Sequence, residues 1–438
     1  MESAGSLRRG IGLASATGLV VGGTIGVGIF LTPAGMAKSL GSPALLLLVW
    51  AFLGAMALAG ALCFGELAAR FPEAGGGYVY LREAFGPGVA FLYGWKCLLV
   101  MDPGLTAALA TGLGAYAVVL VPGLPAKGVA LAAIAAAAAA NLAGVRLAVG
   151  VAQALAVAKV GVLAVLVVFG LLGGAGEWSH LEPLVARRAG SPPLVPAMAG
   201  AVVSGFFSFG GWWEVSKLAG EVEDAPRTLP RALALGVLVV TVVYVAVSGA
   251  FLVLVPIEAV TSPETFAAQA GAALFGPRGG AVLSAIVLLS VLGSLFAFMT
   301  FAPRVYYAMA RDGAAPAWVG RVDPRTGAPV RAVLVQAVLA ALLVALGTFD
   351  AIVAYFVFAT VAFLGLTVAG TFVLRRRSGP SPVGAPLFPL TPAFFLASIV
   401  VVLVLLLLGR PLEAGLGVAV VALGWPVYRL RAGRRGER

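Results

Sequence analysis

Two glycine-rich segments could expose backbone polar groups within strongly apolar stretches. Residues 22–28 contain four glycines, and residues 204–212 contain Gly205, Gly210 and Gly211. Each glycine weakens a helix by about 1 kcal/mol relative to alanine. Both segments therefore predict broken helices. Inside a membrane, the N–H and C=O groups freed by a break are tolerated only where they line a cavity or meet a ligand.

The chemistry of two such breaks is recognition of a zwitterion. N–H groups at the start of a half-helix, together with its dipole, hold a carboxylate, and freed carbonyls hold an ammonium. A pocket between the breaks would bind an α-amino acid head group without a charged side chain. Alternatively, the glycines only let helices pack closely. Two such segments, five spans apart, favour an inverted-repeat transporter.

Lys159 lies in the middle of an apolar stretch. A lysine at the centre of a membrane helix costs about 2.5–3.5 kcal/mol, so a function is the default interpretation. The alternative is that its side chain extends to the membrane interface.

Asp102 and helix 6 carry further charges. Asp102 precedes Pro103 and could be a pocket acid, a partner for a lysine, or the cap of a restarted helix. Glu214, Lys217 and Glu221 have the i, i+3, i+7 spacing of one helix face. This spacing predicts a structural ladder of ion pairs.

The composition requires a membrane to position these residues. Of the 438 residues, 61% are hydrophobic and 11% charged, whereas soluble domains carry about 25% charged residues. Runs long enough to cross about 30 Å of hydrocarbon predict an all-α membrane protein of twelve transmembrane helices. Their expected limits are 11–38, 43–69, 89–121, 127–144, 150–173, 196–220, 231–256, 279–309, 331–348, 350–374, 388–408 and 412–430.

The net charge of +11 is not spread as a nucleic-acid surface would be, and no nucleic-acid partner is expected. Twenty Lys and Arg residues fall on one side of the predicted spans, six on the other and three within them. The positive-inside rule then predicts a multi-pass protein of the cytoplasmic (inner) membrane, in contact with the lipid bilayer, with both termini in the cytoplasm.

Other chemistries find no support in the residues. No Walker A sequence and no Cys/His metal spacing is present, and the single histidine, His180, falls in an external loop. Cys63 and Cys97 lie in apolar stretches and are expected to be buried thiols. We therefore expect no enzyme, no catalytic residue, no cofactor and no metal site.

Three stretches resemble the amino acid–polyamine–organocation (APC) superfamily. They are residues 26–33 (GVGIFLTP), residues 65–78 (GELAARFPEAGGGY) with the pairs at 85–86 and 94–95, and residues 207–212 (FSFGGW). The Gly-Gly-Trp form is similar to the L-type amino acid transporter branch and its bacterial relatives. The resemblance covers essentially the whole chain.

The resemblance implies a five-plus-five inverted repeat with helices 1 and 6 broken. The first half, helices 1–5, would cover residues 1–175, and the second half, helices 6–10, residues 176–380. Helices 11 and 12 and a basic cytoplasmic tail would occupy residues 381–438.

The resemblance also implies the site. The substrate carboxylate would meet the N–H groups around Val27 and Gly28, and its ammonium the carbonyls near Thr24, Phe207 and Gly210. Phe207 matches an aromatic position that gates the site. Lys159 would place its ammonium where sodium-coupled relatives bind a cation between helices 1, 5 and 8. The complete predicted substrate-binding set is Thr24, Ile25, Gly26, Val27, Gly28, Phe207, Ser208 and Gly210.

The sequence departs from the family pattern in three places. Val27 replaces the usual serine, so a hydroxyl contact is lost. Ala225-Pro226-Arg227 displaces the usual Asn-Pro-x-Arg pattern. The external cysteine that links animal relatives to an ancillary subunit has no counterpart, and we expect no obligatory ancillary subunit.

These observations predict an amino acid transporter working by alternating access. Sodium-independent exchange of neutral L-amino acids is the simplest cycle. The alternatives are a proton-coupled amino acid symporter, with Lys159 as the titrating group, and a membrane amino acid sensor that does not transport. The residues do not separate exchange from proton coupling, and they leave the side-chain preference and the oligomeric state open.

Overall fold

The computed structural model describes residues 7–174, 176–260, 263–347, 349–381 and 383–436. The predicted domain limit at residue 175 and the basic residue Arg438 lie outside these ranges. The helices in chain order are α1 (Leu13–Thr24), α2 (Gly28–Leu40), α3 (Pro43–Arg70), α4 (Gly77–Phe85), α5 (Pro87–Lys96), η1 (Cys97–Met101), α6 (Asp102–Leu120), α7 (Ala126–Leu142), α8 (Val145–Leu172), η2 (Trp178–Leu181), α9 (Leu194–Ser208), η3 (Trp212–Glu221), α10 (Ala225–Leu254), η4 (Ile257–Ala259), α11 (Pro263–Phe275), η5 (Gly276–Arg278), α12 (Gly279–Phe301), α13 (Pro303–Arg311), α14 (Val330–Leu346), α15 (Phe349–Ser378), α16 (Leu390–Gly409), α17 (Pro411–Ala422) and α18 (Gly424–Gly436).

The described helices agree with the predicted all-α membrane fold. Within the described ranges, nine helical segments are long and apolar enough to cross a membrane, or ten if α1 and α2 form one bent span. The shorter apolar helices α7 and α14 have 17 residues each, the lower limit for a span. They coincide with the predicted fourth and ninth spans, and the total of twelve stays a prediction.

Three predicted spans are less regular than expected. The third contains the π-helical turn η1 between α5 and α6. The eighth, expected at 279–309, is divided into α12 and α13, with Pro303 at the start of α13. The last is divided into α17 and α18. Proline lacks the N–H that continues a helical ladder, which accounts for the irregularities next to Pro103 and Pro303.

Short polar sequences end and restart the helices. Gly41 ends α2 with φ of 63°, in the left-handed region that glycine enters at little cost. Ser42 accepts a hydrogen bond from the N–H of Leu45 at 3.4 Å, and Pro43 occupies the first turn of α3. Such a cap followed by proline is a favoured helix start.

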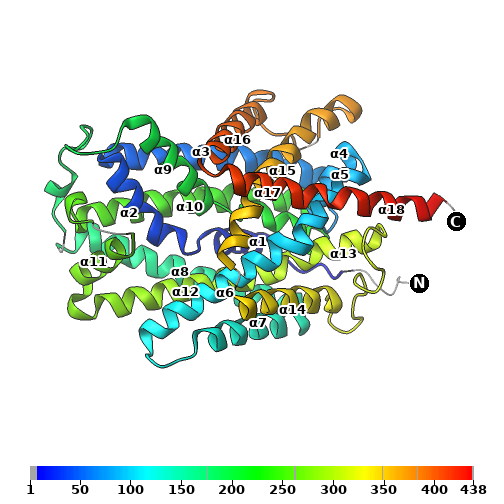
Figure 1. The fold of residues 1–438 in the computed structure, drawn as a ribbon, viewed down its shortest axis with the longest axis horizontal. Coiled ribbons are helices and arrows are strands. Elements are labelled where there is room, and N and C mark those ends of the chain that lie inside the picture. The colour runs from blue at the N-terminus through cyan, green and yellow to red at the C-terminus, as the bar shows by residue number, and fades with distance from the viewer. Residues whose placement is uncertain (1–6, 175, 261–262, 348, 382, 437–438) are drawn as a thin grey trace.

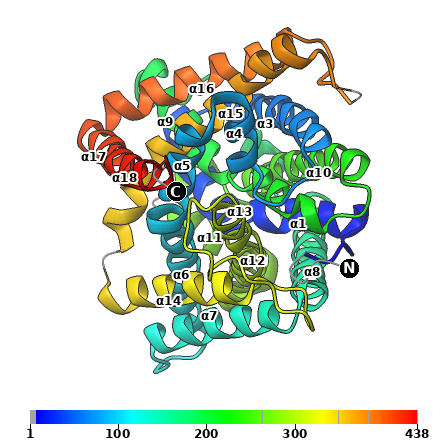
Figure 2. The same cartoon turned by 90° about the vertical axis from the view of Figure 1, so that its right-hand side faces the viewer.

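The helices form a bundle whose axes run mostly along its longest dimension (Figure 1). The view along the bundle in Figure 2 shows α7 and α14 at the edge opposite α16. The two ends of the chain lie at the same end of the bundle (Figure 1). Helix α1 packs against α8, α10 and α12, so the first glycine-rich segment lies in the interior.

A buried ion pair anchors the end of η3. Arg304 Nε and Nη2 donate to the two carboxylate oxygens of Glu221 at 2.7 and 2.9 Å. Their side chains are 1% and 0% exposed. Close by, the N–H groups of Gly10 and Ile11 donate to the Glu221 carbonyl. The segment before α1 is therefore tied to the end of η3.

We expect Arg304→Met to lower the free energy of unfolding by about 3–5 kcal/mol, because it leaves the Glu221 carboxylate buried and unpaired. The double variant Glu221→Gln/Arg304→Met should lose less, since no charge remains uncompensated. Thermal unfolding in detergent measures both. A single variant that melts at the wild-type temperature would contradict this account of the pair.

Candidate functional site

The first predicted break is present between α1 and α2, which are bent by 48°. Thr24 ends α1, Ile25 is extended with ψ of 92°, and Gly28 begins α2. No side chain caps α2 at Val27. A helix start carries N–H groups without intrahelical partners, so this end of α2 presents donors that can bind an anion.

The second predicted break separates α9 from η3. Ser208 ends α9, and Gly211 has φ of 113°. Residues with a side chain rarely adopt this backbone angle. The chain then continues as a ten-residue 3-10 helix. The N–H of Gly210 donates to the Phe207 carbonyl at 2.9 Å, so the turn at the break satisfies part of its own backbone.

The two breaks lie directly against each other. A Cβ atom at Gly28 would lie 2.6 Å from Ser208 Oγ and 2.9 Å from Ser208 Cα, and one at Gly211 would lie 2.8 Å from the Gly23 carbonyl oxygen. The hydroxyls of Thr32 and Ser208 are 2.7 Å apart. Glycine is required at Gly28 because only a residue without a side chain permits this approach.

Tyr244 of α10, which is not among the predicted site residues, joins the two breaks. Its hydroxyl lies 3.1 Å from the Thr24 carbonyl oxygen and 2.6 Å from that of Ser208, at the last residues of α1 and α9. A phenol has one hydrogen to donate, so the two carbonyls share it. Its place within an apolar helix gave no spacing signal that could have found it.

Lys159 of α8 lies against the first break. Its Nζ donates to the carbonyl oxygens of Gly22 (3.0 Å), Ile25 (2.6 Å) and Ser290 (2.7 Å) and lies 3.3 Å from Ser294 Oγ. The residue is fully buried. The ammonium thus joins α8 to the broken first helix and to α12, and all four of these partners are neutral oxygens.

The remaining predicted site residues lie around the breaks. Phe207 is 40% exposed and packs edge-on against Phe206, so its ring is accessible as a gate would be. Gly26 and Gly210 are partly exposed. The carbonyls of Thr24 and Phe207, expected to meet a substrate ammonium, already accept protein hydrogen bonds. Each carbonyl has a second lone pair, so both can accept another.

Asp102 does not cap α6; no side-chain cap is present there. It is instead the partner of a lysine: Lys217 Nζ lies 3.2 Å from its Oδ1 and 2.5 Å from Glu214 Oε2. The predicted ladder is wrong for Glu221, which binds Arg304. The reason is the 3-10 winding of η3, because three residues per turn keep i+3 on one face and rotate i+7 away.

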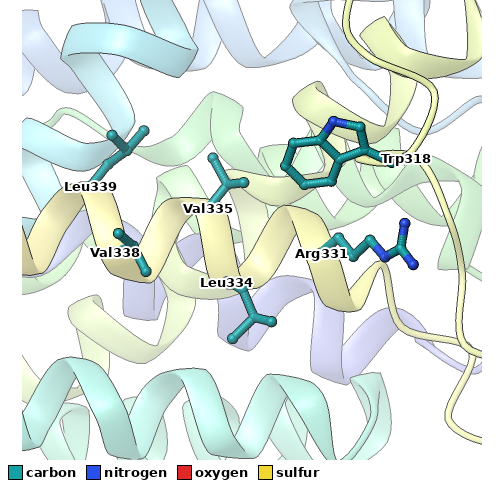
Figure 3. A pocket seen from close by; sticks show the side chains of 6 residues that line it. All are labelled: Trp318, Arg331, Leu334, Val335, Val338 and Leu339. Atoms are coloured by element: carbon teal, nitrogen blue, oxygen red, sulfur yellow. The ribbon is translucent and has the colours of Figure 1, made fainter.

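Of two pockets in the described part of the chain, one lies along α14 and the other adjoins the second break. One, of about 350 Å³, is an apolar hollow along α14 (Figure 3) lined by Trp318, Arg331, Leu334, Val335, Val338 and Leu339. Leu334 and Val338 are about half exposed, as expected for side chains facing lipid. The other is a small gap beside Phe209 and Trp212. Neither is lined by residues 22–28.

A model of the family described as amino acid permease matches residues 11–423. The chain belongs to the amino acid permease family. The permease is therefore an amino acid transporter of multi-pass membrane architecture and not an enzyme. The predicted membership of the APC superfamily is confirmed.

Three curated relatives span nearly the whole permease. "Large neutral amino acids transporter small subunit 2" of Homo sapiens is 31% identical, with 97% of this chain and 81% of the relative covered. "b(0,+)-type amino acid transporter 1" of Mus musculus is 30% identical, with 87% and 80% covered. "Asc-type amino acid transporter 1" of Homo sapiens is 28% identical, with 97% and 82% covered.

The comparison corrects one expectation. The absence of an external cysteine predicted a transporter without an ancillary subunit, but a relative 31% identical over almost the whole permease is named a small subunit. That name describes one part of a larger assembly. The inference failed because a missing cysteine excludes only a covalent link, whereas subunits also associate through noncovalent surfaces.

We expect Gly28→Ala to abolish amino acid transport, because its Cβ would displace Ser208 and separate the two breaks. Gly35→Ala, on the same helix but with open space around its Cβ, is the matched control and should transport normally. Uptake of labelled leucine into proteoliposomes compares the two. Equal rates would show that close contact between the breaks is not needed.

Proposed function

We propose that the permease exchanges neutral L-amino acids by alternating access without sodium. The names of the relatives support neutral substrates, since one is called a transporter of large neutral amino acids. The observation that carries sodium independence is the Lys159 ammonium on the carbonyls of Gly22 and Ile25. An ammonium at these oxygens supplies the positive charge that a bound sodium ion would otherwise bring.

The proposed binding mode uses the two breaks. The substrate carboxylate binds the N–H groups at Val27 and Gly28, where α2 begins without a side-chain cap. The substrate ammonium binds carbonyls near Thr24, Phe207 and Gly210. Val27 contributes only its backbone, so the lost serine hydroxyl of the family costs one contact. Phe207, which is partly exposed, covers the site from outside.

The orientation and repeat belong to the same proposal. The permease lies in the cytoplasmic membrane with both termini in the cytoplasm. The excess of twenty basic residues over six on one side and the shared end of the chain termini in Figure 1 support this. Residues 1–175 and 176–380 form the two inverted halves, each beginning with a broken helix, and residues 381–438 form the last helices and the tail.

Any subunit that accompanies the permease would associate noncovalently. The name of the closely matching relative supports a second subunit. The only two cysteines of the chain, Cys63 and Cys97, are free and buried, so neither can form a disulfide with another protein without unfolding its surroundings.

Replacing sodium by choline on both sides of proteoliposomes should leave the initial rate of leucine exchange unchanged. Lys159 already occupies the place of the cation, so there is no sodium to lose. Efflux of preloaded labelled leucine, driven by unlabelled leucine outside, gives the rate. A strong dependence on sodium would refute the assignment of Lys159.

Lys159→Ala should slow exchange by about tenfold or more, because two carbonyls at the first break and the Ser290 carbonyl of α12 lose a charge-assisted donor. Folding is checked by thermal unfolding in the same detergent.

An exchanger also needs amino acid on the far side: vesicles without internal substrate should take up little leucine. Proton entry in step with leucine, followed by a trapped pH dye in such vesicles, would contradict exchange.

A further inference from the structure

Four charged side chains lie buried on the third and sixth spans, apart from Lys159 and from the Glu221–Arg304 pair. They are Lys96, at the end of α5, Asp102, at the start of α6, and Glu214 and Lys217, both on η3. Their exposed fractions are between 0% and 2%. Two acids and two lysines balance in charge, as a buried group in a membrane requires.

The two acids share one ammonium. Lys217 Nζ lies 3.2 Å from Asp102 Oδ1 and 2.5 Å from Glu214 Oε2. Asp102 Oδ2 and Glu214 Oε1 are buried and have no hydrogen-bond partner among the described residues. The carboxylates therefore keep accepting capacity that the single tethered ammonium does not use.

Lys96 does not occupy the same place. Its Nζ lies 3.2 Å from Met101 Sδ, 3.3 Å from Thr360 Oγ1 and 4.9 Å from the ring centre of Tyr93. Its ammonium contacts a sulfur, a hydroxyl and an aromatic face. It balances the charge of the two acids without lying between them. Lys217 is thus the group that fills the space between the two acids.

One acid of the pair, Glu214, follows the second break closely in the chain. The N–H of Glu214 donates to the Gly211 carbonyl at 3.1 Å, so Glu214 is one 3-10 turn below the second break. Three residues of such a helix rise about 6 Å. A lysine substrate whose head group is bound at the break has a flexible four-carbon side chain. That side chain is long enough to bring its ammonium close to the level of Glu214.

We propose that Asp102 and Glu214 form a site for one alkylammonium ion, that Lys217 occupies it from within the chain, and that Lys217 thereby excludes substrates with cationic side chains. The inference rests on the proposed function, because that function places the substrate at the breaks. A cationic side chain arriving beside Lys217 meets a like charge on an ammonium that already pairs with both acids, and such a mismatch discriminates between substrates.

The first test is binding of propylammonium to Lys217→Ala. Propylammonium has the three carbons and the nitrogen that the substitution removes, so it fits the vacated space. Added propylammonium chloride should raise the melting temperature of this variant in detergent by several degrees, since a ligand that binds only the folded state stabilises it. Sodium chloride at equal ionic strength should not, and the wild type should not respond to either salt.

The control variant is Glu214→Gln/Lys217→Ala. It removes one acid together with the ammonium and leaves Asp102 balanced by Lys96, so it should fold without added amine and show no shift with propylammonium. An equal shift in both variants, or none in Lys217→Ala, overturns the proposal. Failure to recover folded Lys217→Ala even when propylammonium is present throughout purification also overturns it.

The second test is transport. External lysine should drive efflux of preloaded labelled leucine at least about tenfold faster through Lys217→Ala than through the wild type or the control variant, because only that variant offers an empty acid pair. Wild-type exchange of leucine against leucine must be present first, and its absence would refute the proposed function itself. Leucine exchange by the wild type without any gain of lysine exchange by Lys217→Ala refutes only the role of Lys217.

Discussion

Backbone groups freed inside a membrane must find partners, and this constraint organises the molecule. A break at membrane depth leaves N–H and C=O groups that lipid cannot satisfy. At the first break, backbone carbonyls accept hydrogen bonds from the Lys159 ammonium and from the hydroxyl groups of Ser290 and Ser294. Tyr244 serves the carbonyl ends of both α1 and α9. The freed carbonyls thus accept hydrogen bonds from donors within the protein. The uncapped start of α2, in the proposed binding mode, presents its N–H groups to a substrate carboxylate.

Lys159 and Lys217, two of the three lysines buried among the described residues, illustrate two ways of holding an ammonium inside the protein. Lys159 is surrounded by neutral oxygens, so no carboxylate cancels its charge, as the proposed replacement of a metal cation requires. Lys217 lies between carboxylates, so its charge is cancelled and its effect is to fill a site. The same residue type therefore has different consequences, and its partners decide which.

The positions of the breaks were predictable, because glycine weakens a helix wherever it occurs. That Lys159 has a role inside the protein was the prediction from sequence, because an isolated lysine in an apolar span is costly. The partner of Glu221 was not: Arg304 is 83 residues away along the chain, and the expected ladder assumed an α-helix where a 3-10 helix forms. Tyr244 was also missed, because its role depends on two carbonyls brought together only by the folded bundle.

The proposed mechanism requires that the broken helices hold the substrate while Lys159 holds the first break. A high-resolution experimental structure with leucine bound tests it most directly. We predict the leucine carboxylate within hydrogen-bonding distance of the N–H groups of Val27 and Gly28, with Lys159 Nζ still on the carbonyls of Gly22 and Ile25. A carboxylate bound elsewhere, or a metal ion on those carbonyls with Lys159 turned away, would contradict the account.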